Sequence, residues 1–444
     1  MKKNIIIVLS VVLVVGIVLV LTLHAGKNSV SEIYKKQDTI IKTIDRDGFT
    51  EETIHIDKNA ECVITGRMSE IPDEQGLISN RSFIMVLDSS LNIKWAKSTP
   101  FYDIWAIPLK DNGFALLNQD EDSLYLTKFD DDGIVLWSKK YAQIPFHLNA
   151  SFATKNVIIE TQDRGFAILG VGIIKLDSSG NIEWAKEYSG QGTYWPLSMT
   201  GSAITETEDG GYASALWIMD PPRGGGSGAV WGCCNDFLVI KTDSKGNLIS
   251  SRWIGRNLTN EGPNSLIVDE KGNFVVSGWG VTIQPPGGTD YTTSFPIVIL
   301  DKNLNVMSLK DLIVQEGDCY YLSKTPDGYI GTGSGIVELD NNLNVKWAKR
   351  NKDIALSYVD TDGCTFVAVG NSTSFLSSND NRSQILIMKG DVRNFKSDKF
   401  KNFEIKEDQF TPDINKLVNL HTEDITSKIS VTPTKIKLES VDLE

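Results

Sequence analysis

Cysteine is the residue type whose spacing in this sequence most directly suggests chemistry. Cys233 and Cys234 are adjacent, and the remaining cysteines are Cys62, Cys319 and Cys364. Adjacent cysteines can close a strained vicinal disulfide, pair with cysteines elsewhere or remain thiols, and sequence alone leaves these alternatives open because disulfide geometry is so specific. No Cys-x-x-Cys spacing occurs, so the sequence supports neither a zinc ribbon nor a thioredoxin-type redox motif.

Histidine and carboxylate patterns do not supply a catalytic centre either. The chain has only four histidines, which nearly excludes a His-based triad or a multi-His metal site. Acidic runs occur at 120–122 and 130–132, and the second lacks the alternating spacing of a calcium loop, so solvated turns are the favoured interpretation. Nucleophile-elbow, Walker and dinucleotide fingerprints are absent. We therefore predict no catalytic residue, no metal site and no cofactor.

Two Pro/Gly-rich insertions carry the residues that we predict to bind a ligand or partner. They span Pro221–Asp236 and Thr282–Pro296, and aromatic residues stand inside them and at their roots. Proline and glycine hold backbone shapes that regular structure does not allow. The predicted contact residues are Trp217, Trp231, Cys233, Cys234, Trp279, Tyr291 and Phe295. The alternative is that the two loops only pack on each other.

A repeated phrase positions these insertions. Its clearest copy is Ile173–Lys186, in which an Asp begins a tight turn that leads to a Trp, and the equivalent aspartates are Asp88, Asp130, Asp177, Asp243, Asp301 and Asp340. An Asn follows each of them by four residues, except after Asp130, where the residue is Ile134. Copies this numerous indicate a structural module and not a single site.

A second phrase, similar to Asp-Gly-Gly-Tyr, precedes each copy, and a degenerate last copy brings the number of units to seven. Each unit has four short runs rich in Val, Ile, Phe and Trp, separated by Gly, Asp and Asn turns, which is the signal of antiparallel strands. Seven four-stranded units predict an all-β fold, a seven-bladed β-propeller of antiparallel blades. A Trp at a fixed place in the unit is typical of packing between blades.

The alternation of Asp-Gly-Gly-Tyr with Leu-Asp-x-x-Gly-Asn-x-x-Trp resembles the propeller repeats of archaeal and bacterial surface proteins, a class often labelled quinoprotein-like. The turn from Asp to Trp is also similar to the tryptophan-docking turn of pyrroloquinoline-quinone dehydrogenases. The resemblance covers roughly residues 50 to 395. It implies a fold and says almost nothing about function.

Strand alternation assigns the connections to two faces. The turns between strands 1 and 2 and between strands 3 and 4 share a short-turn face. The loops between strands 2 and 3 and between blades share a long-loop face, which receives every long insertion, namely 67–82, 218–236, 281–295 and 371–383. Because loops on a rigid scaffold commonly bind ligands, we expect function on the long-loop face.

The N-terminus suggests an address outside the cytoplasm. Lys2 and Lys3 precede an apolar run, Ile5–Leu23, of 19 residues, which is long enough for one transmembrane helix. We predict a retained signal anchor with the body outside, and secretion after signal cleavage is the alternative. Five Asn-x-Ser/Thr sequons fit that location. The net charge of −13 argues against a nucleic-acid partner.

The predicted domains follow from these patterns. They are a membrane anchor at 1–25, a linker and closing strand at 26–50, the propeller at 51–405 and a tail at 406–444. We hypothesise that Thr39–Ile44 forms the outer strand of the last blade, and Phe395–Ile405 is the competing segment. Beyond residue 406, Lys428–Leu438 is interpreted either as one added strand or as part of a tail.

These observations favour a membrane-anchored, extracytoplasmic β-propeller that binds a protein or glycan partner through its long-loop face without catalysis. The alternative is an extracytoplasmic enzyme, either a quinoprotein-like oxidoreductase or a polysaccharide-acting enzyme. A purely structural envelope component is the third candidate. The scarcity of histidine and the lack of catalytic motifs favour the first.

Overall fold

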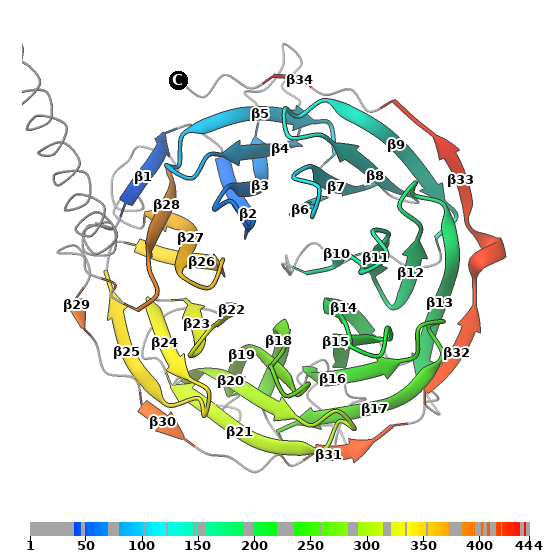
Figure 1. Ribbon diagram of the computed structural model, residues 1–444. Coiled ribbons are helices and arrows are strands. Elements are labelled where there is room, and N and C mark those ends of the chain that lie inside the picture. Colours follow the sequence, from blue (N-terminus) through cyan, green and yellow to red (C-terminus); the bar gives the residue numbers. More distant parts are fainter. Residues whose placement is uncertain are drawn as a thin grey trace, which may run out of the picture.

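The fold is given by a computed structural model. It describes residues 40–45, 49–69, 80–101, 103–120, 123–144, 148, 156–190, 199–219, 235–256, 259–282, 292–313, 321–333, 335–351, 354–372, 384–393, 395, 401–402, 406–408, 414–418, 420–435 and 439–440. The strands form seven antiparallel sheets around a central axis, so the predicted all-β, seven-bladed propeller is confirmed (Figure 1).

Each blade contains consecutive strands ordered from the axis outwards. Blade 1 consists of β2 (Phe49–Ile56), β3 (Cys62–Ser69), β4 (Asn80–Leu87) and β5 (Ile93–Thr99). Blade 2 consists of β6 (Asp103–Pro108), β7 (Phe114–Gln119), β8 (Ser123–Phe129) and β9 (Val135–Ala142). Blade 3 consists of β10 (Ile158–Glu160), β11 (Phe166–Leu169), β12 (Gly172–Leu176) and β13 (Ile182–Gly190). Blade 4 consists of β14 (Met199–Glu206), β15 (Tyr212–Met219), β16 (Asn235–Thr242) and β17 (Leu248–Gly255).

The remaining blades follow the same plan. Blade 5 consists of β18 (Thr259–Val268), β19 (Phe274–Thr282), β20 (Thr292–Leu300) and β21 (Val306–Ile313). Blade 6 consists of β22 (Tyr321–Thr325), β23 (Gly328–Thr332), β24 (Ile336–Asp340) and β25 (Val345–Arg350). Blade 7 consists of β26 (Ile354–Thr361), β27 (Thr365–Ser372) and β28 (Gln384–Asp391), and β1 (Ile40–Asp45) is its outermost strand.

The repeated Asp is the organiser of the outer hairpin. In blade 3, Asp177 Oδ1 accepts the amides of Ser179 and Asn181 at 2.9 and 2.8 Å, and Oδ2 accepts the Asn181 side chain at 2.8 Å. Burial pushes the pKa of Asp177 up, but these hydrogen bonds outweigh it and the net pKa is lowered. The carboxylate therefore holds the turn together.

The fourth position of this turn has positive φ in every copy, and two residue types meet that demand. Glycine occupies it at Gly133, Gly180 and Gly246, with φ of 74°, 75° and 74°. Leucine occupies it at Leu91, Leu304 and Leu343, with φ of 61°, 63° and 65°. The leucines are almost fully buried, so burial of the side chain offsets the cost of the left-handed backbone.

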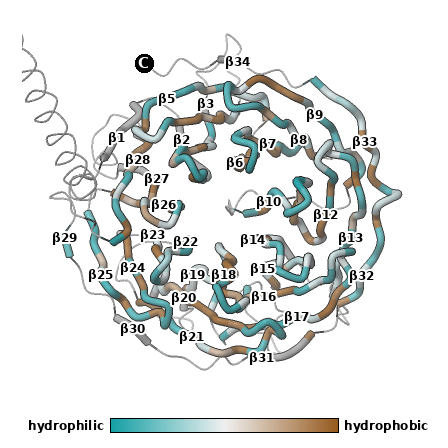
Figure 2. Tube along the Cα trace, in the orientation of Figure 1, coloured by the Kyte–Doolittle hydropathy of each residue, from teal (hydrophilic) through white to brown (hydrophobic). Residues whose placement is uncertain are grey.

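The outer tryptophans pack on these glycines of the next blade. A Cβ added to Gly180 would lie 2.8 Å from the Trp137 ring, and one added to Gly133 would lie 2.8 Å from the Trp95 ring. Trp137 also meets Phe166 edge-on at 5.9 Å. The tryptophans thus join neighbouring blades, and hydrophobic residues run along the middle strands while hydrophilic turns surround the axis (Figure 2).

The ring is closed by the N-terminal strand. β1 pairs antiparallel with β28 from Ile40↔Lys389 to Asp45↔Gln384. The structure therefore has the closure that we hypothesised for Thr39–Ile44, and the segment after β28 does not take the outer position of blade 7. The apolar run at 1–25 lies outside the described residues. Within the part of the chain that is described, no helix is long and apolar enough to span a membrane.

The C-terminal residues form a belt around the ring, which the sequence did not predict. The belt consists of β29 (Lys401–Asn402), β30 (Lys406–Asp408), β31 (Ile414–Leu417), β32 (Leu420–Asp424), the 3₁₀ helix η3 (Thr426–Lys428), β33 (Ser430–Pro433) and β34 (Glu439–Ser440). Its strands add a fifth strand to blades 6, 5, 4, 3, 2 and 1 in that order (Figure 1). The single added strand anticipated within Lys428–Leu438 is therefore one of six.

Candidate binding site at the long-loop ends of blades 4 and 5

Two of the predicted aromatic residues lie against each other at the roots of the two insertions. Trp217 comes from β15 and Trp279 from β19, and their ring centroids are 5.2 Å apart at an interplanar angle of 61°. Trp217 Nε1 donates a hydrogen bond to the Pro263 carbonyl at 3.2 Å. Trp217 is 6% exposed, whereas Trp279 is half-buried. The pair joins blades 4 and 5, and Trp279 is the partner with exposed surface.

Glycine at position 262 allows this approach. A Cβ added to Gly262 would lie 2.6 Å from the Trp217 ring and 2.7 Å from Trp279 Nε1. Contacts below 3 Å are not tolerated in a packed interior, so any larger residue would displace the tryptophans. The first strand of blade 5 is therefore fitted to the aromatic pair.

A buried ionic cluster lies at the same end of blade 5. Arg256 follows β17, and its Nε donates to Glu261 Oε1 on β18. Its Nη1 donates to Asp311 Oδ2 on β21 at 2.6 Å, and its Nη2 donates to Ser294 Oγ on β20 at 3.4 Å. The side chains of Glu261 and Asp311 are only 4% and 5% exposed. One arginine thus connects the last strand of blade 4 with three strands of blade 5.

The environment of Glu261 and Arg256 shifts the pKa values of both groups. Burial raises the pKa of Glu261 to about 7, although Arg256 opposes the shift through its charge and hydrogen bond. Burial would lower the pKa of Arg256, but the two carboxylates outweigh it and raise that pKa. With both acids ionised, the cluster carries one net negative charge, which is costly to bury.

The distance between this cluster and the tryptophans is short because of chain connectivity. Glu261 precedes Gly262, the residue beneath the aromatic pair. Gly280 follows Trp279, and a Cβ added there would lie 3.0 Å from Arg256 Nη2. The aromatic pair and the ionic cluster therefore lie at the same end of blade 5, on successive residue pairs of β18 and β19.

The third strand of blade 4 carries a further buried acid near its start. Asp236 is fully buried, and its Oδ2 accepts a hydrogen bond from Trp253 Nε1 at 2.7 Å. A Cβ added to Gly255 would lie 2.0 Å from Asp236 Oδ1. Trp253, which stands three residues beyond the regular Trp position of the repeat, is thus hydrogen-bonded within its own blade.

The predicted contact residues fall into three groups in the structure. It brings Trp217 and Trp279 together. It places Phe295 on β20, 2% exposed, in the core shared by blades 5 and 6, which is a packing position and not the exposed position that a contact residue needs. Trp231, Cys233, Cys234 and Tyr291 lie outside the described residues.

The sequence analysis placed Phe295 in the insertion Thr282–Pro296, but β20 already begins at Thr292. In the structure Pro296 lies opposite Asp311 within β20 and β21. The sequence analysis also missed Arg256, Glu261 and Asp311. The available signal was Glu261 itself, a charged residue within a strand whose equivalents are largely apolar.

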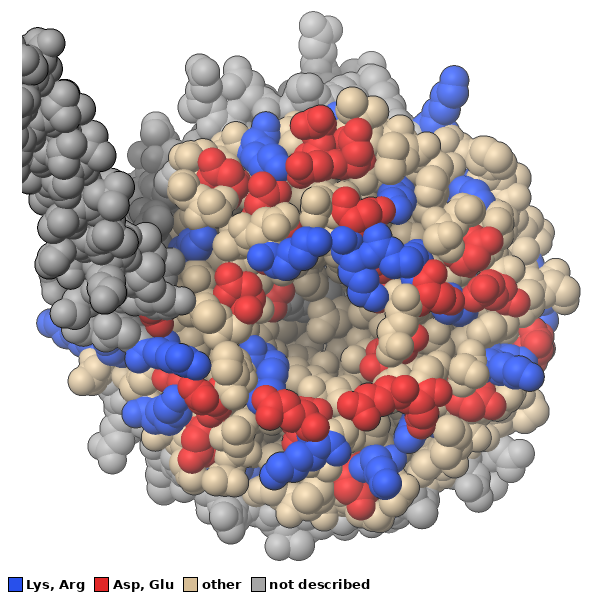
Figure 3. Space-filling view, viewed as in Figure 1, with Lys and Arg blue, Asp and Glu red and all other residues tan. Residues whose placement is uncertain are grey.

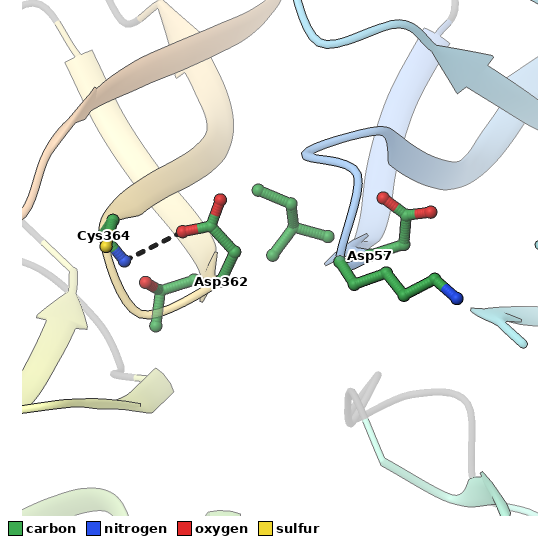
Figure 4. A pocket seen from close by; sticks show the side chains of 6 residues that line it. Asp57, Asp362 and Cys364 are labelled. Atoms are coloured by element: carbon green, nitrogen blue, oxygen red, sulfur yellow. Dashed lines mark hydrogen bonds between the residues drawn. The ribbon is translucent and has the colours of Figure 1, made fainter. Parts of the chain in front are cut away.

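On the short-turn side, the described residues line two shallow cavities. One measures about 500 Å³ and is lined by Ile56, Asp57, Lys58, Thr361, Asp362 and Cys364. Asp57 and Asp362 come from neighbouring turns on either side of it (Figure 4). A second cavity of about 390 Å³ adjoins it through Thr361 and Asp362.

The acids of the larger cavity are engaged in their own turns. Asp362 Oδ1 accepts the Cys364 amide at 2.9 Å, and Asp57 Oδ1 accepts the Asn59 amide at 2.8 Å. Cys364 is an exposed free thiol. Charged side chains of both signs surround the central hollow in Figure 3. Among the described residues, no group of three or more His, Cys, Asp or Glu could hold a metal ion.

Comparisons with known proteins assign no function to this chain. No protein-family model matches the sequence, and no curated protein matches it. A catalytically inactive virginiamycin B lyase from Staphylococcus aureus with quinupristin is 12% identical, with a TM-score of 0.45 over 78% of this chain and 99% of that one. Polysaccharide lyase Uly1 is 9% identical, with a TM-score of 0.45 over 79% and 99%.

A member of the DUF4221 family from Bacteroides vulgatus is 8% identical, with a TM-score of 0.37 over 83% of this chain and 98% of that one. At these sequence identities, the activities of the two lyases describe those proteins and are not carried over to this chain. The fold assignment of this chain rests on its own strand pairing.

Proposed function

We propose that this protein is a non-enzymatic, extracytoplasmic binding propeller that holds a protein or glycan partner at the long-loop ends of blades 4 and 5. The observation that carries the proposal is the Trp217–Trp279 pair, which lies at the roots of both insertions. Aromatic residues dominate the energetics of protein interfaces and offer flat apolar faces to sugars. Trp279 is the residue expected to contact the partner.

The ionic cluster supports this role by fixing the platform. Arg256 holds blade 4 to blade 5 through Glu261 and Asp311. Contacts that are rigid before binding reduce the entropy cost of association. The partner would then meet a preformed aromatic surface.

The test replaces residues 221–234 with a short Gly/Ser loop and, separately, changes Trp279→Ala. Binding is measured on a glycan array and against surface proteins of the source cell. We expect each change to weaken binding by about tenfold or more, as hot-spot residues do. The matched control shortens 373–383, an insertion of the same face in blade 7, which should leave binding unchanged. Unchanged binding in both test variants would remove the site.

One observation favours the enzymatic alternative. A carboxyl with a pKa near 7, such as Glu261, is suited to general acid–base catalysis. Its hydrogen bond to Arg256 and its burial argue for a structural role. Turnover of a polysaccharide by the wild type, abolished in Glu261→Gln, would establish the enzyme and displace the binding role.

The membrane anchor is the second part of the proposal. Its support is the apolar run Ile5–Leu23 behind Lys2 and Lys3. Cell fractionation and N-terminal sequencing of the mature protein test it. A membrane-bound protein that retains residues 1–25 is expected, and a soluble protein that begins near residue 26 would show cleavage.

A further inference from the structure

A run of three exposed apolar residues opens the outer strand of blade 2. Ile134, Val135 and Leu136 are 61%, 42% and 55% exposed. The other exposed large apolar residues among the described positions are Ile93, Ile249 and Met307, one to a blade. Single exposed apolar residues are ordinary, whereas a contiguous group marks an interaction site or an aggregation hazard.

Ile134 is also the residue at which the repeat departs from its pattern. The five equivalent residues, Asn92, Asn181, Asn247, Asn305 and Asn344, each donate their amide to Oδ2 of the repeat aspartate at 2.8–3.0 Å. Isoleucine cannot make this bond, so only the backbone amides of Asp132 and Ile134 reach Asp130 Oδ1. Blade 2 has therefore exchanged a turn hydrogen bond for an exposed hydrophobic side chain, and its own stability does not explain the exchange.

The strand edge beside this run accepts an added strand. The belt strand β33 pairs antiparallel with β9 from Ser430↔Ala142 to Pro433↔Lys139. Beyond Pro433, Thr434 donates its amide to the Ser138 carbonyl at 3.1 Å. On the inner side β9 pairs with β8 as far as Val135, whereas on its outer side none of the described belt residues pairs with Val135–Trp137. An exposed apolar strand edge of this kind is a template for another chain.

Negative charge adjoins the apolar run. Asp130, Asp131 and Asp132 precede it directly. Lys94 of blade 1 contacts Asp131 at 2.7 Å but also contacts Glu61 at 2.9 Å. The Asp131 side chain is still 50% exposed. The turn therefore keeps a net negative charge next to an apolar strand edge.

We propose that the start of β9, Ile134–Trp137 together with the Asp130–Asp132 turn, is a docking edge for an extended segment of a partner protein that carries apolar residues beside Lys or Arg. The segment would add to blade 2 by β-augmentation, in line with the belt strand already paired farther along β9. Ile134 and Leu136 would take the apolar side chains, and the aspartates would take the basic ones. This edge lies on the circumference and is independent of the long-loop site.

The test is a selection of random dodecapeptides displayed on phage against the full protein. The counter-selection uses the double variant Ile134→Asn with Leu136→Lys, which restores residues found at the equivalent positions of blade 1, Asn92 and Lys94. We expect enriched peptides with alternating apolar residues flanked by Lys or Arg. Their synthetic versions should bind the double variant at least tenfold more weakly in fluorescence anisotropy, and added salt should weaken them further.

A control variant, Ile249→Ser in blade 4, should leave peptide binding unchanged. The circular dichroism spectrum should be the same for all variants, because the altered side chains are exposed. Enrichment of acidic peptides, failure to enrich any, or equal binding to the double variant would overturn the proposal. A dimer of the wild type that dissociates in the double variant would instead identify a second copy as the occupant and would also overturn it.

Discussion

The ring of blades and the C-terminal belt are both built by antiparallel strand pairing, but they differ in strand length and in how much of each strand is buried. Ring strands are four to ten residues long for the most part and bury nearly all of their apolar side chains. Belt strands are two to five residues long, and in the described part of the belt only Ile425 and Ile429 are buried. The ring is therefore held by its core, whereas the belt is held by edge hydrogen bonds, by partly buried contacts such as those of Val418 and Leu420, and by one fully inserted apolar anchor.

That anchor lies where blades 2 and 3 meet. Ile425 and Ile429 pack into the core cluster of those blades. The turn between them is fixed by Ile425 N donating to the Ala185 carbonyl at 3.0 Å and by Ala185 N donating to Thr426 Oγ1 at 2.8 Å. Covering the outer edges protects them from other chains. The difference teaches that the belt completes the ring but does not create its fold.

The largest effect should come from the ring core. Phe166→Ala removes a ring that is 1% exposed and packs against Trp137. Large-to-small changes at such positions cost about 3–5 kcal/mol. Denaturant unfolding followed by tryptophan fluorescence measures the loss. A cost below about 1 kcal/mol would mean that blades 2 and 3 are not joined by this contact.

Removing the belt anchor should cost less free energy of unfolding than Phe166→Ala, and it should release the belt while the ring stays folded. Ile425→Ala opens a cavity at a fully buried position, and such changes cost about 2–5 kcal/mol when the site cannot relax. Here the belt can detach, so the loss cannot exceed the free energy that holds the belt. We expect faster proteolysis of residues 401–444 and retained circular dichroism of the ring. Thr432→Ala, an exposed belt position, is the matched control.

Deleting residues 401–444 extends that comparison. The outer strands β5, β9, β13, β17, β21 and β25 would lose their added strands. We expect the ring to keep its strand content and unfold cooperatively but to self-associate in light-scattering measurements. A deleted chain that is unfolded would show that the belt is part of the folding unit.

The sequence predicted the ring because every blade repeats the same chemistry. The Asp177 turn and the Trp137 contact each recur in other blades with the same partners, so counting copies was enough to reach the number of blades. The belt has no such signal. Its strands are two to five residues long, at or below the length at which alternation identifies a strand. Four of the six, β31 to β34, have partners more than 150 residues away in sequence.

Only part of the candidate site could be predicted from the sequence. Trp217 and Trp279 stand out because they interrupt a repeat. Glu261 and Asp311 come from β18 and β21, and Arg256 directly follows β17, so their meeting depends on how blades 4 and 5 are packed. Pairwise spacing in the sequence does not contain that information.

The next prediction concerns the pH dependence of stability that results from burying the Glu261 carboxyl group in the ring. The folded pKa of Glu261, about 7, exceeds its ordinary 4.5 because of burial, so the folded state binds the proton more tightly than the unfolded state. Stability should therefore fall as the pH rises from 4.5 to 7, by up to about 3 kcal/mol. Glu261→Gln should flatten this dependence in urea titrations, and Glu423→Gln on the belt should not. A wild-type stability that rises across this window would contradict the assignment.

The smallest effect is a gain at blade 2. Ile134→Asn should restore the hydrogen bond that the other turns make to Oδ2 of their aspartate, and such a bond is worth about 0.5–1.5 kcal/mol. Because Ile134 is 61% exposed, little apolar burial is lost in exchange. Thermal unfolding measured beside Asn181→Ala, which removes the same bond from blade 3, should give shifts of opposite sign. If Ile134→Asn destabilises the protein, the isoleucine packs more than its exposure indicates, and the docking edge on β9 loses its physical basis.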